Sequence, residues 1–142
     1  MKRKIQRINN YISRRIQELE RRRHDPDCPK LRQSEKGWVY AFVDKGRIRY
    51  VGITSQTLSQ RRHGHIGPYP DCPFAHALAR EATGKEGPNK DLLKHRDYKM
   101  CYRRGQDRIR EMKIIAIRES CGHRRHLLEV AAAIAFKTLN KF

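Results

Sequence analysis

The stretch from Gly37 to Ile53 constrains the fold most, because it reads as two strands joined by a tight turn. Residues 38–43 and 48–53 are rich in aromatic and β-branched side chains, which favour strands. Between them, Asp44-Lys45-Gly46-Arg47 places a glycine where a short hairpin turn requires a positive φ. The sequence therefore predicts an antiparallel hairpin, and with it a β-sheet.

Residues 3–23 have the periodicity of a basic amphipathic helix. Its apolar side chains recur at spacings of three and four: Ile5, Ile8, Ile12, Ile16 and Leu19. This stripe must pack either on the main domain or on the same helix of a second copy, since the spacing is also heptad-like. The helix is predicted to end before Pro26 and Pro29, which favour a linker.

The rest of the chain alternates between helical and strand-like patterns. We predict helices at 57–65, 74–82, 89–100 and 123–138, a basic connection at 101–108, and a third strand at 112–118. The expected fold is mixed α/β (α+β), with a small three-stranded, largely antiparallel sheet flanked by helices. Its expected parts are a basic helix at 1–24, a linker at 25–36, and a domain at 37–142 with a helical insertion at about 67–110.

The charge of the chain indicates an anionic partner. Lys and Arg number 33 against 15 acidic residues, which gives a formal net charge of +18. Nucleic acid is favoured over a membrane, because no apolar run approaches the roughly 20 residues that span a bilayer. No apolar signal-peptide stretch follows the N-terminus, so we expect an intracellular protein.

Four cysteines, at 28, 72, 101 and 121, are expected to be free thiols, since none forms a C-x-x-C pair. Two of them lie in Pro-Asp-Cys-Pro runs at 26–29 and 70–73. A zinc site shared by these runs with nearby histidines is the alternative interpretation.

Two tyrosines lie on the predicted hairpin, one on each strand. Tyr40 and Tyr50 flank the turn, so their phenols could stand on one face of the sheet. The alternative is that both are ordinary strand aromatics. Arg61 and His65 are spaced i, i+4 on the helix that follows, where a guanidinium could hold a phosphate. The alternative there is a solvated basic helix.

Glu129 lies within an apolar run, residues 127–136, that we expect to be largely buried. A buried carboxylate is costly unless a cation or hydrogen-bond donors satisfy it. A divalent metal or Arg61 could do so, and a salt bridge to Arg125 is the alternative.

The order of these residues carries a resemblance to a known family. Val39-Tyr40 is followed ten residues later by Tyr50-Val51-Gly52, then by Gly52-Ile53-Thr54, Leu58, Arg61 and His65; Leu128-Glu129, Ile134 and Leu139-Asn140 lie near the C-terminus. Residues 37–66 and 112–140 thereby resemble the GIY-YIG nuclease family. Trp38 stands where the family usually has glycine, at a position that supports the strand.

The resemblance implies a metal-dependent DNA endonuclease that hydrolyses phosphodiester bonds. Glu129 would hold one Mg²⁺ (or Mn²⁺), because only Glu119 and Glu129 are acidic in the last 31 residues. Arg61 would bind the scissile phosphate, Tyr40 or His65 would act as the base, Tyr50 would orient water or a phosphate oxygen, and Asn140 would fix the local geometry. The alternative is a non-catalytic basic nucleic-acid-binding protein on the same fold.

DNA contacts outside this site are expected from basic side chains on the N-terminal helix, the Arg61 helix and the insertion. They are Arg3, Arg7, Arg14, Arg15, Arg62, His63, Lys94, Arg96, Arg103, Arg104, Arg108 and Arg110. A homodimer through the N-terminal helix would suit an enzyme that cuts both strands.

Overall fold

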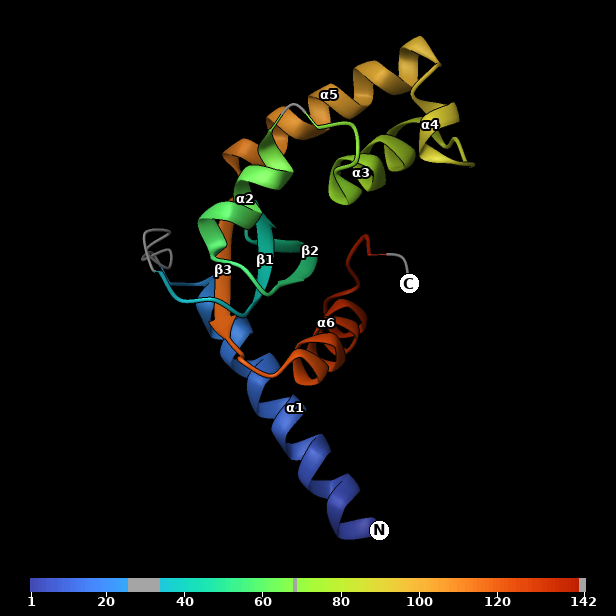
Figure 1. The fold of residues 1–142 in the computed structure, drawn as a ribbon. Coiled ribbons are helices and arrows are strands. Elements are labelled where there is room, and N and C mark those ends of the chain that lie inside the picture. Colours follow the sequence, from blue (N-terminus) through green and yellow to red (C-terminus); the bar gives the residue numbers. More distant parts are fainter. Residues whose placement is uncertain (26–33, 68, 141–142) are drawn as a thin grey trace.

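The structure, a computed structural model, describes residues 1–25, 34–67 and 69–140. The predicted linker at 25–36, including Cys28, therefore falls mostly outside the described residues. The described chain is mixed α+β, as predicted, with a three-stranded antiparallel sheet between two groups of helices (Figure 1).

The hairpin forms the centre of the sheet. Strand β1 (Trp38–Asp44) pairs with β2 (Arg47–Thr54) on one side and with β3 (Lys113–Arg118) on the other, in the order β2-β1-β3. The turn between β1 and β2 has φ of 50° at Lys45 and 76° at Gly46, so the prediction of a positive φ at this glycine is confirmed. Both turn residues are left-handed, as in the two-residue turns that suit twisted hairpins.

A β-bulge decides which face of the sheet each tyrosine occupies. Near the turn, Val43 pairs with Ile48, but beyond the bulge Phe42 pairs with Tyr50 and Tyr40 with Gly52. A regular ladder from the same turn would pair Tyr50 with Ala41 and send its ring to the opposite face from Tyr40. The extra residue in β2 therefore brings the two phenols to one side.

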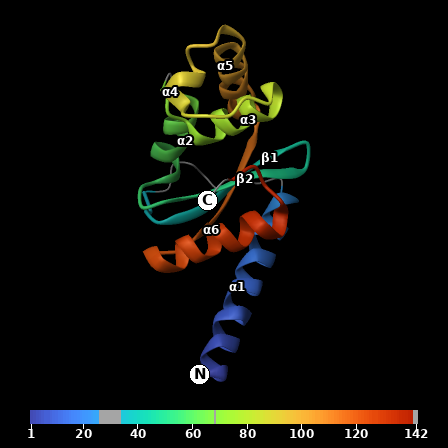
Figure 2. The same ribbon diagram turned by 90° about the vertical axis from the view of Figure 1, so that its right-hand side faces the viewer.

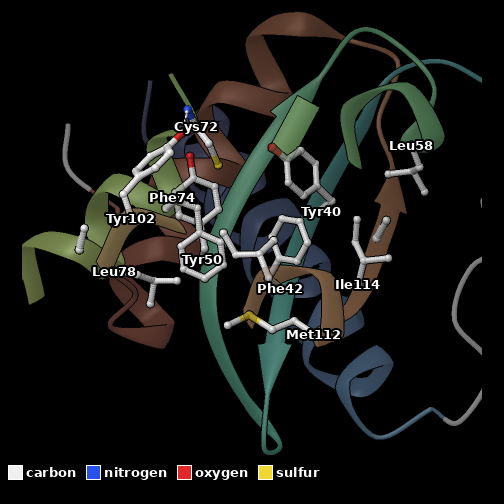
Figure 3. Packing of buried hydrophobic residues seen from close by; sticks show 14 of the residues in the cluster. Tyr40, Phe42, Tyr50, Leu58, Cys72, Phe74, Leu78, Tyr102, Met112 and Ile114 are labelled. Atoms are coloured by element: carbon white, nitrogen blue, oxygen red, sulfur yellow. Dashed lines mark hydrogen bonds between the residues drawn. The ribbon is translucent and has the colours of Figure 1, made fainter. Parts of the chain in front are cut away.

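Each face of the sheet has its own apolar core. One face carries Tyr40, Phe42 and Tyr50 and is covered by α2 (Leu58–Ile66), α3 (Pro73–Thr83) and α5 (Arg96–Glu111) (Figure 3). The other face carries Val39, Ala41 and Val51 and is covered by α1 (Lys2–Arg23) and α6 (Gly122–Phe136) (Figure 2).

The insertion is more helical than predicted. The expected connection at 101–108 is wrong, because α5 runs unbroken from Arg96 to Glu111, while the short α4 (Asn89–Leu92) covers only the start of the predicted 89–100 helix. Tyr98, Tyr102 and Ile109 bury one face of α5. Gly105 lies where α3 comes close, since a Cβ there would be 3.4 Å from Leu78 Cβ. The glycine thus lies within a helix that packs against α3, and not in a turn.

Helix α1 divides its apolar stripe between two environments. Leu19 is buried, and Ile12 and Ile16 pack with it against the core. Ile5 and Ile8 remain 50% and 49% exposed, on the half of the helix that projects past α6 (Figure 1). The stripe therefore packs on the main domain along its C-terminal part, one of the two alternatives that its spacing allowed.

Helix α6 is less buried than its composition suggested. Leu127, Val130 and Ile134 are 43%, 38% and 70% exposed, so the expectation that residues 127–136 are largely buried is wrong. Only the side of the helix that carries Leu128 and Ala132 meets the sheet. Apolar composition alone did not reveal that this helix is covered on one side.

Candidate active site

Tyr40 lies at the centre of the candidate site, on the middle strand of the sheet. It is fully buried, and its ring lies over Gly52, its partner across the hairpin. Phe42 and His65 contact the ring edge to face, with centroids 5.9 and 5.6 Å away. These contacts fix the direction of the hydroxyl group.

The Tyr40 hydroxyl joins two residues of α2. Arg61 Nε donates a hydrogen bond to it over 2.8 Å, and His65 Nε2 lies 2.7 Å from the same oxygen. Helix α2 begins with a capping box between Thr57 and Gln60, which fixes its first turn. The spacing of four residues then directs Arg61 and His65 to one side of the helix, as the sequence predicts.

The chain of contacts continues to the insertion. On its other side, His65 Nδ1 lies 3.3 Å from the sulfur of Cys72, which directly precedes α3. Within the described residues, His65 Nε2 is the only acceptor for the Tyr40 proton. The phenol therefore donates to Nε2, and the second ring nitrogen carries the proton that points at Cys72.

Burial keeps this chain of groups neutral at Tyr40 and His65. Burial raises the pKa of the Tyr40 phenol well above its usual value, against the opposing effect of Arg61. Burial, with a smaller effect from Arg61, lowers the pKa of His65 to about 3. At neutral pH, His65 is therefore an uncharged acceptor whose side chain is almost fully enclosed.

Helix α5 holds the loop that carries Cys72. The Tyr102 hydroxyl accepts a hydrogen bond from the Cys72 backbone N–H over 3.1 Å and donates one to the Tyr69 carbonyl. Gln106 Nε2 donates to the carbonyls of Gly67 and Tyr69. The insertion thus forms part of the site, by positioning the residue behind His65.

Glu129 belongs to α6 and lies close enough to this series of hydrogen-bonded groups to influence Tyr40 electrostatically. Its carboxylate is partly buried, with 19% of the side chain exposed, and His126 Nδ1 lies 3.9 Å from one of its oxygens. The expected alternative, a salt bridge to Arg125, is wrong: Arg125 donates instead to the carbonyls of Glu119 and Ser120. Burial raises the pKa of the Glu129 carboxyl, while His126 and Arg61 oppose the rise.

A pocket of about 270 Å³ opens beside Glu129. Its wall also includes Tyr50, Asn140 and, from the insertion, His76, Arg80 and Asn89. Burial raises the pKa of the Tyr50 phenol to about 12, so this group enters the pocket as a neutral hydroxyl. The pocket joins the two parts of the chain that carry the resemblance.

Asn140 holds the outer edge of β2. Its side chain accepts a hydrogen bond from the Val51 N–H over 3.0 Å and donates one to the Val51 carbonyl over 2.6 Å. The Leu139 N–H donates to the Arg49 carbonyl over 3.0 Å. The amide therefore contacts the strand between Tyr50 and Gly52, and its effect on the geometry of a catalytic site stays a prediction.

The acidic groups bear on the metal prediction. Among the described residues, no set of three His, Cys, Asp or Glu side chains is arranged to hold a metal ion. Glu119 is engaged in docking α1, because it accepts a hydrogen bond from Tyr11 and another from the Cys121 N–H. Glu129 lines a pocket and offers a single carboxylate, and an ion held by one carboxylate would keep most of its water ligands. The described cysteines, Cys72, Cys101 and Cys121, are free.

The basic residues predicted to contact DNA fall into three groups. Several are exposed on α1 and α5: Arg3, Arg7, Arg14, Arg96, Arg103 and Arg104. Others already contact protein groups: Lys94 pairs with Asp91, Arg108 with Asp44, Arg110 with Asp107, Arg62 donates to the Arg110 carbonyl, and His63 contacts the Tyr69 ring. Arg15 is the third case. It pairs with Glu18 and donates to the Arg118 carbonyl, so it serves the docking of α1.

Sequence reasoning did not find three residues of the site. Cys72 and Arg80 reach it only through the folding of the insertion, and no local pattern points to that contact. Gly52 belongs to the Tyr50-Val51-Gly52 motif, but its position opposite Tyr40 depends on the bulge.

Comparisons of this chain with protein-family models, curated proteins and solved structures found no match. No helix in the described ranges is both long and apolar enough to cross a membrane.

Proposed function

We propose that this protein is a metal-dependent DNA endonuclease that hydrolyses phosphodiester bonds. The observation that carries the proposal is the chain of hydrogen bonds from Arg61 through Tyr40 to His65. A fixed guanidinium, a hydroxyl and a neutral imidazole in contact supply an anion-binding group beside a route for a proton. The order of these residues in the sequence, and their resemblance to GIY-YIG nucleases, support the same activity.

In the proposed mechanism, Arg61 binds the scissile phosphate and stabilises the charge that develops in the transition state. The Tyr40 hydroxyl receives a proton from the attacking water as its own proton passes to His65 Nε2. A bound phosphate offsets the positive charge of Arg61, which contributes to the low pKa of His65. Substrate binding therefore makes the imidazole a better proton acceptor. Tyr40 and His65 act as one relay.

Glu129 would hold one Mg²⁺ or Mn²⁺. When bound, the ion would supply positive charge that stabilises the negative charge developing in the transition state. Tyr50 contributes a neutral hydroxyl beside the same pocket and orients a water or a phosphate oxygen. Asn140 fixes the strand between Tyr50 and Gly52.

The first experiment is cleavage of supercoiled plasmid by the wild type and by Glu129→Ala, with magnesium and with EDTA. Nicking or linearisation that requires magnesium, and disappears in Glu129→Ala while DNA binding is retained, is the expected result. Glu111→Ala, which removes an exposed carboxylate at the end of α5, is the control and should cut like the wild type. A pure protein that binds DNA but does not cut under any metal would instead indicate the non-catalytic alternative.

We also propose that two copies associate through the projecting part of α1. Ile5 and Ile8 continue the stripe that Ile12, Ile16 and Leu19 bury, yet they are half exposed. Exposed basic side chains on the same helix, such as Arg3 and Arg7, would repel between copies, so bound DNA should favour the dimer. Sedimentation should show a DNA-dependent dimer for the wild type and a monomer for Ile5→Ser/Ile8→Ser.

A further inference from the structure

The pocket beside Glu129 is lined by a positively charged side chain, Arg80, that lies outside the part of the sequence resembling GIY-YIG nucleases. Arg80 belongs to α3, within the insertion, and lies in the wall of this pocket with Tyr50 and Glu129. Glu129 is the only carboxylate among the described residues that line it. A positive and a negative side chain therefore occupy the same small pocket without an ion pair between them.

Arg80 is held in place by neutral groups. One of its terminal nitrogens donates to the Gly87 carbonyl over 2.9 Å and to the Asn89 side-chain oxygen over 2.5 Å. Within the described part of the chain, it forms no ion pair. Its charge is thus fixed in direction and not neutralised, an arrangement that suits a planar group for binding a phosphate.

A second hollow lies beside Arg61, further along β2 and α6. Arg61, Arg125 and His126 line it, together with residues 53–56 after the end of the Tyr50 strand. On α6, Arg125 and His126 lie about one turn before Glu129. On β2, Ile53 lies three residues beyond Tyr50, a distance of roughly 10 Å at the rise of a strand. The two hollows therefore follow one another along β2 and α6. Each contains candidate active-site residues, because Tyr50 and Glu129 line the first and Arg61 lines the second.

We propose that this surface binds a continuous strand of DNA, with the scissile phosphate at Arg61 and a second phosphate, further along the same strand, at Arg80. The inference deepens the proposed function and rests on it. The insertion would then have two roles: it holds the loop that carries Cys72, and it supplies Arg80 as a residue that binds the substrate.

A purely structural role for Arg80 makes a different prediction. If Arg80 only fixed residues 84–89 through Gly87 and Asn89, its removal would weaken DNA binding by the same factor at every salt concentration. A phosphate contact releases a counterion, so its loss changes the dependence of binding on salt, with a slope of about −0.9 for each contact to duplex DNA. The salt dependence separates the two roles even when Arg80→Ala lowers stability.

The test is fluorescence anisotropy of a labelled DNA duplex with the full chain in EDTA, titrated from about 50 to about 200 mM salt. For Arg80→Ala, the slope of log affinity against log salt should be smaller in magnitude by about 0.9, so its deficit relative to the wild type shrinks about 3.5-fold over this range. Arg80→Lys, which keeps the charge, should retain most of the slope. Arg47→Ala, which removes an exposed cation at the start of β2 outside both hollows, should match the wild type.

An unchanged slope for Arg80→Ala, or an equal change for Arg47→Ala, overturns the inference. Plasmid cleavage with magnesium, measured on the same preparations, separates this failure from failure of the proposed function. If the wild type cuts DNA and the Arg80→Ala slope is unchanged, only the proposal of a second phosphate site fails. If the salt slope depends on Arg80 but the wild type cuts DNA under no metal, the endonuclease proposal fails and the proposed DNA-binding surface stands.

Discussion

Gly52 lies directly opposite Tyr40 across the hairpin, and any other residue there would place its Cβ 2.3 Å from the Tyr40 hydroxyl oxygen and 2.4 Å from Cζ. Tyr40 cannot move away without losing its contacts to Arg61 and His65. The glycine is therefore required by close approach of a ring, rather than by a special backbone conformation.

Gly52→Ala should accordingly cost about 1–3 kcal/mol of stability, as overpacking in a core does, and should abolish cleavage by displacing the hydroxyl group. Thermal unfolding and plasmid nicking measure the two effects. Gly64→Ala is the matched control in α2, because a Cβ there meets no atom within 4 Å. It should raise stability by roughly 0.5–1 kcal/mol through helix propensity. Equal effects of the two substitutions would refute the close approach.

Tyr40→Phe should reduce the cleavage rate by about 10²–10⁴-fold, the usual contribution of a positioned proton-transfer group. The fold should survive, with a loss of about 1–3 kcal/mol because Arg61 and His65 lose a buried partner. Tyr98→Phe is the control: it removes another fully buried phenol, whose partner is His76 rather than Arg61 or His65. If Tyr98→Phe slows cleavage as much as Tyr40→Phe, the Tyr40 hydroxyl has no special part in the reaction.

The stability of the protein should depend on His65 in acid. The folded-state pKa of His65 is about 3, below the unfolded value of 6.5, so the unfolded chain binds the proton more tightly. This contribution to stability is fully present above pH 6.5. As the pH falls from 6.5 towards 3, it is lost by about 1.4 kcal/mol per unit. Denaturant unfolding of the wild type and of His65→Gln should therefore converge in acid, and parallel curves would contradict the assignment.

Cys72 should fix the tautomer of His65. In the wild type, ¹⁵N NMR should find the ring proton on Nδ1, facing the sulfur, with Nε2 free to accept from Tyr40. Cys72→Ser keeps an acceptor and should retain both the tautomer and most of the cleavage. Cys72→Ala leaves the Nδ1 proton without a partner, at a cost of about 1–3 kcal/mol. A proton found on Nε2 in the wild type would reverse the proposed direction of the relay.

Local patterns predicted much of this fold. The hairpin, α2 and β3 all follow from propensity, turn chemistry and periodicity within a few residues. Predictions failed where a long-range contact decides. Gly105 resembles a loop residue until α3 packs against it, and the apolar run of α6 gives no sign that only one side is covered.

The candidate site shows the same division. Arg61 and His65 share a helix face by spacing alone, so their proximity could be predicted. The position of Tyr50 could not be derived from the turn, because the bulge after Phe42 shifts the pairing by one residue. Cys72 and Arg80 enter the site through the packing of α3 and α5, which no pattern of single residues encodes.

Strand β2 carries Tyr50 and is an outer strand of the sheet, and residues 139–140 occupy its outer edge through hydrogen bonds to Arg49 and Val51. An uncovered strand edge is a template on which another chain can add a strand. The same few residues that shape the pocket therefore protect the protein from aggregation. A chain shortened to Thr138 should lose solubility together with activity. Its aggregation should begin before the fold itself is lost.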